Sequence, residues 1–155
     1  MTRAVHSIFV LLSVVAFISA TKVSRCKTDV PRDSLLGVNI TGCDTPPCIL
    51  KKSSTVHIVQ KFIPSEDIKN LTTIVSATIA GIDLPFIGVN GVEACTRITG
   101  ANGAGGCPLK KGVEYIYSNS FNILGFYPAV ALRVHWALKE EDKNITCFEV
   151  PARIV

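Results

Sequence analysis

Apolar and polar residues alternate along much of this chain, as in β-strands that bury one face. The clearest run is 132–139, whose apolar residues share one phase: Leu132, Val134, Trp136 and Leu138. Four other segments also predict strands: 56–62, 71–80, 113–123 and 147–154. In 56–62 the alternation is imperfect, because Gln60 falls in the apolar phase and Val59 in the polar one.

Turn-forming residues separate these segments. Asp44-Thr45-Pro46-Pro47 and the glycine-rich stretches 88–91 and 100–106 interrupt the apolar pattern. No window of 11 residues shows the 3.6-residue apolar stripe of a helix. Six to eight short strands at this spacing predict an all-β fold, an immunoglobulin-like β-sandwich of two antiparallel sheets, with a small barrel as the alternative.

The first twenty residues predict a secretory signal peptide. Arg3 precedes the apolar run 8–18, and Ser19-Ala20 offers small residues for cleavage. The run is short for a membrane span, so a retained anchor is the weaker interpretation. We therefore expect residues 1–20 to be removed and residues 21–155 to form one domain of a secreted, extracellular protein.

The net charge of +4 is small, and its lysines are spread along the chain in pairs such as Lys51-Lys52 and Lys110-Lys111. Such pairs are typical of a solvated surface, and we expect no nucleic-acid partner.

Six cysteines in a secreted chain predict three disulfides. Six cysteines allow 15 pairings, among which the sequence does not choose. Nearness favours Cys43 with Cys48 and Cys95 with Cys107, which leaves Cys26 for Cys147. Zinc is the rival interpretation, but no CxxC pair is present and neither His57 nor His135 stands at ligand spacing from a cysteine. We expect no metal and no cofactor.

Three N-glycosylation sequons begin at Asn39, Asn70 and Asn144. Together with a signal peptide they favour the secretory route, and any sequon that is used must lie at the surface.

The chain carries no recognisable catalytic constellation. No GxSxG motif accompanies His57 or His135, and both histidines fall in the polar phase of strands, where we expect surface residues. The stretch 100–106 lacks the GK[ST] ending of a phosphate-binding loop. The sequence therefore predicts a protein that is not an enzyme.

Two apolar segments lie where glycine and proline mark loops or strand ends: 82–87 and 121–128. They predict either the closed end of a filled core or a hydrophobic mouth that leads between the sheets.

Ordered motifs along the mature chain resemble a known family. They are Gly42-Cys43, Pro47-Cys48, Gly81-Ile82-Asp83-Leu84-Pro85-Phe86, Cys107-Pro108-Leu109, Tyr115-Ile116-Tyr117, Tyr127-Pro128, Val134-His135-Trp136-Ala137-Leu138 and Cys147-Phe148-Glu149-Val150-Pro151. With Cys26 and Cys95 in order between them, this pattern is similar to the ML lipid-recognition domain, and most similar to its Niemann-Pick type C sterol-carrier (epididymal secretory protein) branch and the arthropod relatives of that branch.

The resemblance implies a sandwich whose sheets part to hold a lipid, with disulfides Cys26–Cys147, Cys43–Cys48 and Cys95–Cys107. By motif, the family's entrance residues fall on Phe86, Ile123 and Tyr127. We expect the inward phases to supply the walls of the cavity: Val75, Ile79, Tyr117, Val134 and Trp136.

These observations predict a monomeric carrier of a sterol, a fatty acid or a similar lipid. It would serve lipid transport or chemical signalling, with hand-off to a membrane or a receptor protein and with the lysosomal lumen as a further location. The alternatives are an adhesion or receptor-binding sandwich with a filled core, and recognition of microbial lipid in innate immunity.

Overall fold

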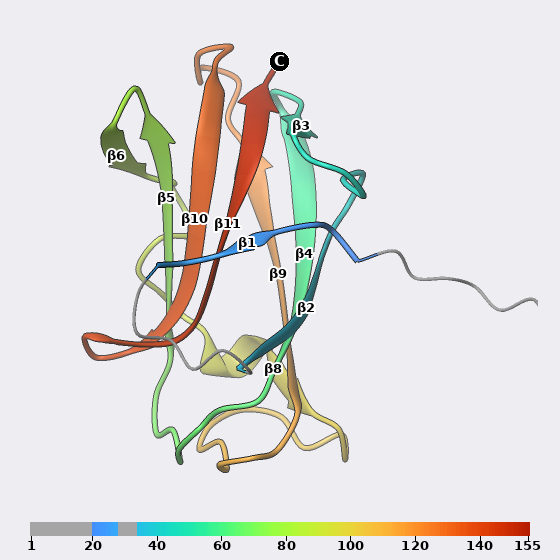
Figure 1. Cartoon of the computed structure of the whole chain (residues 1–155), viewed down its shortest axis with the longest axis vertical. Helices are drawn as coiled ribbons and strands as arrows, with labels where there is room; N and C mark the ends of the chain where they lie inside the picture. Colours follow the sequence, from blue (N-terminus) through green and yellow to red (C-terminus); the bar gives the residue numbers. More distant parts are fainter. Residues whose placement is uncertain (1–19, 28–33) are drawn as a thin grey trace, which may run out of the picture.

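Two β-sheets packed face to face form the fold of the computed structural model (Figure 1), which describes residues 20–27 and 34–155. Most of the predicted signal peptide lies outside the described residues. The larger sheet contains β1 (Ser24–Arg25), β3 (Cys48–Leu50), β5 (Thr72–Ile79), β6 (Ile82–Pro85), β7 (Val92–Glu93), β10 (Ala131–Glu140) and β11 (Lys143–Ile154). The smaller sheet contains β2 (Leu35–Ile40), β4 (Ser54–Phe62), β8 (Ile98–Gly100) and β9 (Tyr115–Ile123).

The larger sheet runs in the order β1-β11-β10-β5-β6, and the smaller in the order β2-β4-β9-β8. Neighbouring strands are antiparallel except for β3, which pairs in parallel with the end of β11 at 152–154. One 3-10 turn, Cys95–Arg97, is the only helical element in the described part of the chain. No helix there has the length and apolar character of a membrane span. The all-β, immunoglobulin-like sandwich expected from the sequence is confirmed.

All five segments predicted as strands are strands, and their bounds shift by a few residues. The structure has eleven strands among its described residues rather than six to eight. The additional strands β1, β3, β7 and β8 are two or three residues long, which is too short for an alternating pattern to be visible.

Strand β4 shows how the strand phase overrides residue type. Burial alternates without a break from Val56 to Phe62, although the sequence in between is irregular. Gln60 is fully buried, whereas Val59 on the other face is 37% exposed. Side chains of a strand alternate between the faces of the sheet, so a polar residue in the inward phase must enter the core.

The three expected disulfides are present: Cys26–Cys147, Cys43–Cys48 and Cys95–Cys107. The first joins the segment after β1 to β11 across a separation of 121 residues. The second closes the turn between β2 and β3. The third ties the 3-10 turn to the loop that precedes β9.

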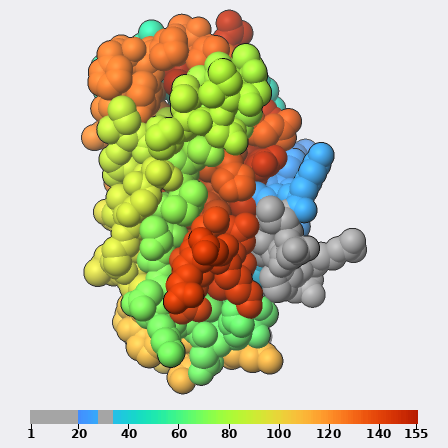
Figure 2. Space-filling view, turned by 90° about the vertical axis from the view of Figure 1, so that its left-hand side faces the viewer, coloured from blue at the N-terminus to red at the C-terminus, as the bar shows by residue number. Residues whose placement is uncertain are grey.

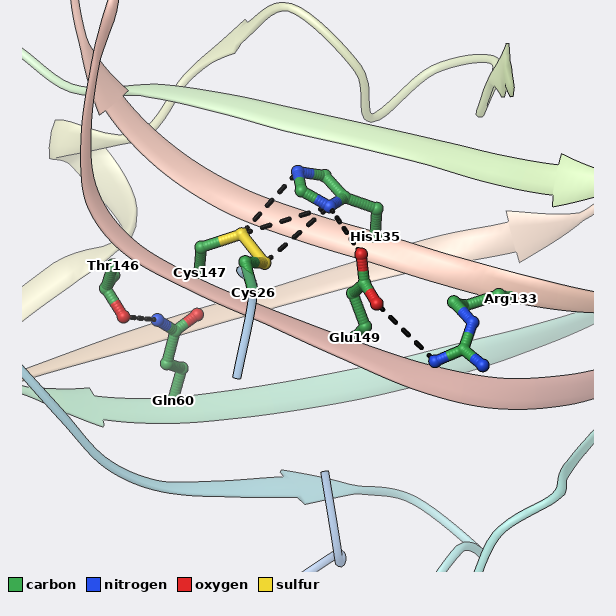
Figure 3. Close-up of a disulfide and its surroundings, with 7 residues drawn as sticks. All are labelled: Cys26, Gln60, Arg133, His135, Thr146, Cys147 and Glu149. Atoms are coloured by element: carbon green, nitrogen blue, oxygen red, sulfur yellow. Dashed lines mark hydrogen bonds and ion pairs between the residues drawn. A yellow bond between two sulfur atoms is a disulfide. The ribbon is translucent and has the colours of Figure 1, made fainter. Parts of the chain in front are cut away.

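His135 is half-buried, unlike the surface residue expected from its strand phase (Figure 3). Its Nδ1 lies 3.6 Å from Sγ of Cys26 and 3.4 Å from Oε1 of Glu149. Cys26, which directly follows β1, contacts His135 on this outer face, and a pattern local to β10 does not reveal such a contact. Although His135 and two sulfur atoms meet here, both sulfurs belong to a disulfide and offer no thiolate to a metal.

Candidate ligand-binding site

A small apolar cavity of about 20 Å³ lies between the two sheets. A void of this size holds about one water molecule. The residues around it come from strands of both sheets: Ile40, Cys48, Leu50, Ile58, Phe121, Val134, Trp136, Phe148, Val150 and Ala152. The interior is therefore nearly closed, and a lipid enters it only if the sheets move apart.

A shallow depression of about 100 Å³ lies above this cavity, where the β5–β6 hairpin meets the loop 124–130. Figure 2 shows these two segments side by side at the upper end of the molecule. The depression is lined by Ala77, Ile79, Leu84, Pro85, Phe86, Tyr127, Pro128, Leu132 and Ile154. We call it the mouth.

Aromatic rings form a continuous chain from the mouth to the interior. The ring centroids of Tyr127 and Phe86 lie 5.9 Å apart, and those of Phe86 and Phe121 lie 5.6 Å apart. Phe121 in turn lies 5.5 Å from Trp136, which stacks on Phe148 at 6.4 Å. Because Phe121 and Trp136 line the cavity, this chain connects the surface to the space between the sheets.

A layer of polar side chains crosses the interior below the cavity. Gln60 Nε2 donates to Thr146 Oγ1 at 2.8 Å, and Tyr117 Oη lies 2.8 Å from Thr73 Oγ1. Both bonds run from the smaller sheet to the larger one. Asn119 Nδ2 also donates to Tyr117 Oη at 2.7 Å. We call these five residues the polar layer, and they hold the two sheets together at the floor of the cavity.

Burial raises the pKa of Tyr117 above its usual value of 10.0, because the phenolate would lose its hydration. The hydrogen bonds with Thr73 and Asn119 oppose this shift but do not cancel it. Tyr117 is therefore neutral over the whole physiological range and acts as a hydrogen-bonding strut.

The structure places the predicted binding residues in different parts of this arrangement. Phe86, Tyr127 and Ile79 line the mouth, and Val134 and Trp136 line the cavity. Tyr117 belongs to the floor, as just described. Val75 and Ile123 are fully buried but line neither space.

Sequence reasoning placed Phe121 in the apolar segment 121–128 but did not name it among the binding residues, although it links the mouth to the cavity. It missed the polar layer as a unit. Phe121 shares the inward phase of β9 with Tyr117, so its strand phase was a usable signal. The polar layer has no such signal in the sequence, because Gln60 and Thr146 are 86 residues apart in the chain.

Another hollow, of about 520 Å³, lies on the outer face of β2 and β4. It borders Ala20, the last residue of the predicted signal peptide, and the exposed Leu36. It does not open between the sheets, so it is not the candidate site.

The fold and its interior define an immunoglobulin-like sandwich with an apolar space between the sheets and an aromatic mouth. The chain belongs to the ML domain family, whose family model matches residues 20–154. The resemblance drawn from the ordered motifs is thereby confirmed.

Known proteins of the Niemann-Pick type C2 group are similar to this chain. NPC intracellular cholesterol transporter 2 homolog a of Drosophila melanogaster is 32% identical over 96% of this chain and 97% of the fly protein. NPC intracellular cholesterol transporter 2 of Mus musculus is 31% identical over 76% of this chain and 74% of its own length. A crystal structure of a Niemann-Pick type C2 protein from Japanese carpenter ant superimposes with a TM-score of 0.71 at 29% identity, and covers 86% of this chain and 99% of the ant chain.

Proposed function

We propose that this protein carries a sterol, a fatty acid or a similar lipid between its two sheets and performs no catalysis. The observation that carries the proposal is the chain of aromatic rings from the mouth to the apolar cavity. The relatives named cholesterol transporters support the same function.

Lipid entry requires the mouth to open, because the cavity of about 20 Å³ is far smaller than the roughly 300–1,000 Å³ of typical ligand pockets. The mouth is joined largely by contacts between apolar rings, whereas the floor is joined by hydrogen bonds between the sheets. A lipid chain can replace ring–ring contacts with contacts of its own, but it cannot replace the floor's hydrogen bonds. We therefore expect the sheets to part at the mouth and stay joined at the floor.

We propose further that residues 1–20 are cleaved and that residues 21–155 act as a secreted monomeric domain that passes its ligand to a membrane or a receptor, outside the cell or in the lysosomal lumen. Of the three sequons, Asn70 is exposed, whereas Asn39 and Asn144 are half-buried. A glycan is expected first at Asn70, and mass spectrometry of the secreted protein, intact and after glycosidase treatment, measures both the new N-terminus and the occupied site.

The carrier function is tested with the oxidised, secreted protein and two fluorescent probes, a sterol and a fatty acid. Saturable uptake of at least one probe, and its displacement by the unlabelled lipid, are the expected results. Absence of saturable uptake of both probes, together with no co-purified lipid in native mass spectrometry, would contradict the proposal.

The mouth assignment is tested separately. Phe86→Ala and Tyr127→Ala remove rings that face one another, and each should weaken uptake severalfold while the protein remains folded. Leu36→Ala is the matched control, because Leu36 is an exposed apolar residue on the outer hollow. If Leu36→Ala weakened uptake as much as the two mouth variants, the outer hollow would be the better site.

A further inference from the structure

The disulfide Cys26–Cys147 lies against the imidazole of His135 on the outer face of the larger sheet (Figure 3). His135 Nδ1 lies 3.6 Å from Sγ of Cys26, and its Nε2 lies 3.5 Å from Sγ of Cys147. The pairing of β10 with β11 produces this contact, because His135 stands opposite Glu149, two positions along the strand from Cys147. Both sulfur atoms are therefore next to one side chain that carries a proton near neutral pH.

Glu149 and Arg133 orient the imidazole ring. Oε1 of Glu149 lies 3.4 Å from Nδ1 of His135, and its Oε2 lies 3.4 Å from Nη1 of Arg133. On the other side, β5 places the uncharged Ser76 opposite His135. A protonated imidazole has two N–H donors. Its Nδ1–H is then donated to the Glu149 carboxylate, and its Nε2–H faces Sγ of Cys147.

The two sulfurs of this disulfide differ in their exposure. Cys26 is half-buried and directly follows the two-residue strand β1, whereas Cys147 is only 2% exposed. In thiol–disulfide exchange a thiolate attacks one sulfur atom and the other sulfur leaves as a thiolate. A thiol from solution reaches Cys26 more easily, so Cys147 becomes the leaving group. It is also the sulfur that Nε2 of His135 faces.

The other two disulfides do not combine these features. Both sulfurs of Cys43–Cys48 belong to buried residues, so a thiol does not reach them. Cys95–Cys107 is half-buried, and the backbone N–H of Leu71 lies 3.3 Å from Sγ of Cys95. A backbone amide donates a hydrogen bond but does not transfer its proton to a leaving thiolate. Among the described residues, the disulfide beside His135 is therefore the one best prepared for exchange.

We propose that Cys26–Cys147 is a site of thiol–disulfide exchange, at which a small monothiol becomes joined to Cys26. The incoming thiol loses its proton to solvent, and its sulfur forms a bond with Sγ of Cys26. The electron pair of the broken S–S bond goes to Sγ of Cys147, which takes a proton from Nε2 of His135, and the imidazole regains a proton from solvent. One thiol and one disulfide react and one of each is formed, so no further oxidant or reductant is needed. This modification site goes beyond the proposed carrier function and does not depend on it.

Exchange removes the covalent link between residues 21–27 and β11. The segment keeps its hydrogen bonds, from Thr21 N to Val38 O at 2.8 Å and from Thr21 Oγ1 to Cys43 O at 2.6 Å. The pairing of β1 with β11 also remains. We therefore expect the modified protein to keep its sandwich, with the N-terminal segment attached by hydrogen bonds alone.

The test exposes the folded, oxidised protein to glutathione, a small monothiol. Acid stops the exchange, N-ethylmaleimide traps the free thiols, and mass spectrometry of peptides locates both groups. Glutathione should appear on Cys26 and the maleimide on Cys147, before either group appears on the other four cysteines.

His135→Asn should slow the exchange at Cys26 roughly tenfold, because the leaving thiolate loses its proton donor. A purely structural role of His135 predicts the opposite change, since looser packing would expose the disulfide and speed the exchange. His135→Gln is the second variant if His135→Asn does not fold. His57→Asn is the matched control, because His57 is exposed on β4 and should leave the rate unchanged. The rate at Cys95–Cys107 in the same samples serves as the internal reference.

Three results would overturn the proposal. The first is exchange at Cys26 that is as fast in the folded His135 variants as in the wild type, or faster. The second is glutathione that appears first on Cys147 or on a cysteine of another disulfide. The third is the absence of any exchange in the folded wild-type protein. None of these results affects the carrier function, which the lipid probes test separately.

Discussion

At the scale of single residues, the polar side chains of the interior decide which end of the sandwich can open. Gln60 and Tyr117 pair across β4 and β9, and each reaches a threonine of the opposite sheet. A hydrogen bond in an apolar interior is costly to break, because neither partner finds water when it separates. The polar layer therefore acts as a fixed end, and the apolar mouth as the end that moves.

The two threonines of this layer should differ in importance. Thr146→Val leaves the Gln60 amide without its hydrogen-bond partner and should lower the free energy of unfolding by about 1–3 kcal/mol. Thr73→Val should cost less, because Tyr117 Oη keeps its bond from Asn119. Urea unfolding measures both, with the half-buried Thr72→Val as the control. An equal loss for Thr73 and Thr146 would contradict this ordering.

Tyr117 makes the stability depend on alkaline pH. Its folded pKa is raised by burial, so at high pH the unfolded chain loses this proton before the native protein does. The stability that neutral Tyr117 contributes is complete below the ordinary tyrosine pKa of 10.0 and is lost as the pH rises toward and through the folded pKa. The difference in unfolding free energy between the wild type and Tyr117→Phe should therefore shrink above pH 10. A difference that stays constant from pH 8 to 11 would contradict it.

At the scale of elements, the strands that border the mouth differ in how many neighbouring strands they pair with. Strand β10 pairs with β5 on one side and β11 on the other, whereas β6 pairs with β5 alone. All four residues of β6 are exposed, and Ile82 is 63% exposed. An edge strand with few buried contacts opens at low free-energy cost, so β6 is the element best suited to move when a lipid enters.

Hydrogen exchange measures this difference. The amides of β10 should exchange slowest, and those of β6 and the loop 124–130 among the fastest. Binding of a lipid should slow exchange in β6 and in that loop more than in the polar layer, because the floor is already fixed. Protection that appeared first at the floor, with no change at β6, would mean that the ligand enters from the other end.

Local patterns predicted the long strands: β9 and β10 show alternation over eight or more residues, and β5 is rich in the Thr, Ile and Val residues that favour strands. The same rule would have placed Gln60 in the core if the strand phase had been given more weight than residue type. Contacts between distant segments were not predictable in this way. The Gln60–Thr146 bond and the contact of Cys26 with His135 arise only when segments far apart in sequence meet. The ordered cysteine motifs supplied such long-range information, which explains why the disulfides were predicted correctly.

At the scale of the whole molecule, two disulfides contribute differently to the stability of the fold and to the shape of the binding site. Cys26–Cys147 joins residues 121 positions apart, whereas Cys43–Cys48 joins residues 5 positions apart. A cross-link that closes a longer loop removes more conformational freedom from the unfolded chain. Cys48, however, lines the cavity, which Cys26 and Cys147 do not.

Replacing each pair by alanine should separate these two contributions. Loss of Cys26–Cys147 should lower the free energy of unfolding by about 5 kcal/mol, and loss of Cys43–Cys48 by about 2 kcal/mol, if loop-closure entropy dominates. If the burial of the sulfurs dominated instead, the short pair would cost at least as much, since Cys43 and Cys48 are both buried.

Lipid affinity should respond in the opposite order. The Cys43→Ala/Cys48→Ala variant changes the wall of the cavity and should bind lipid more weakly. The Cys26→Ala/Cys147→Ala variant should keep its lipid affinity at temperatures where it is folded. Denaturant unfolding combined with probe titration at low temperature measures both quantities on the same samples, and parallel losses in both variants would show that stability and site shape are not separated in this fold.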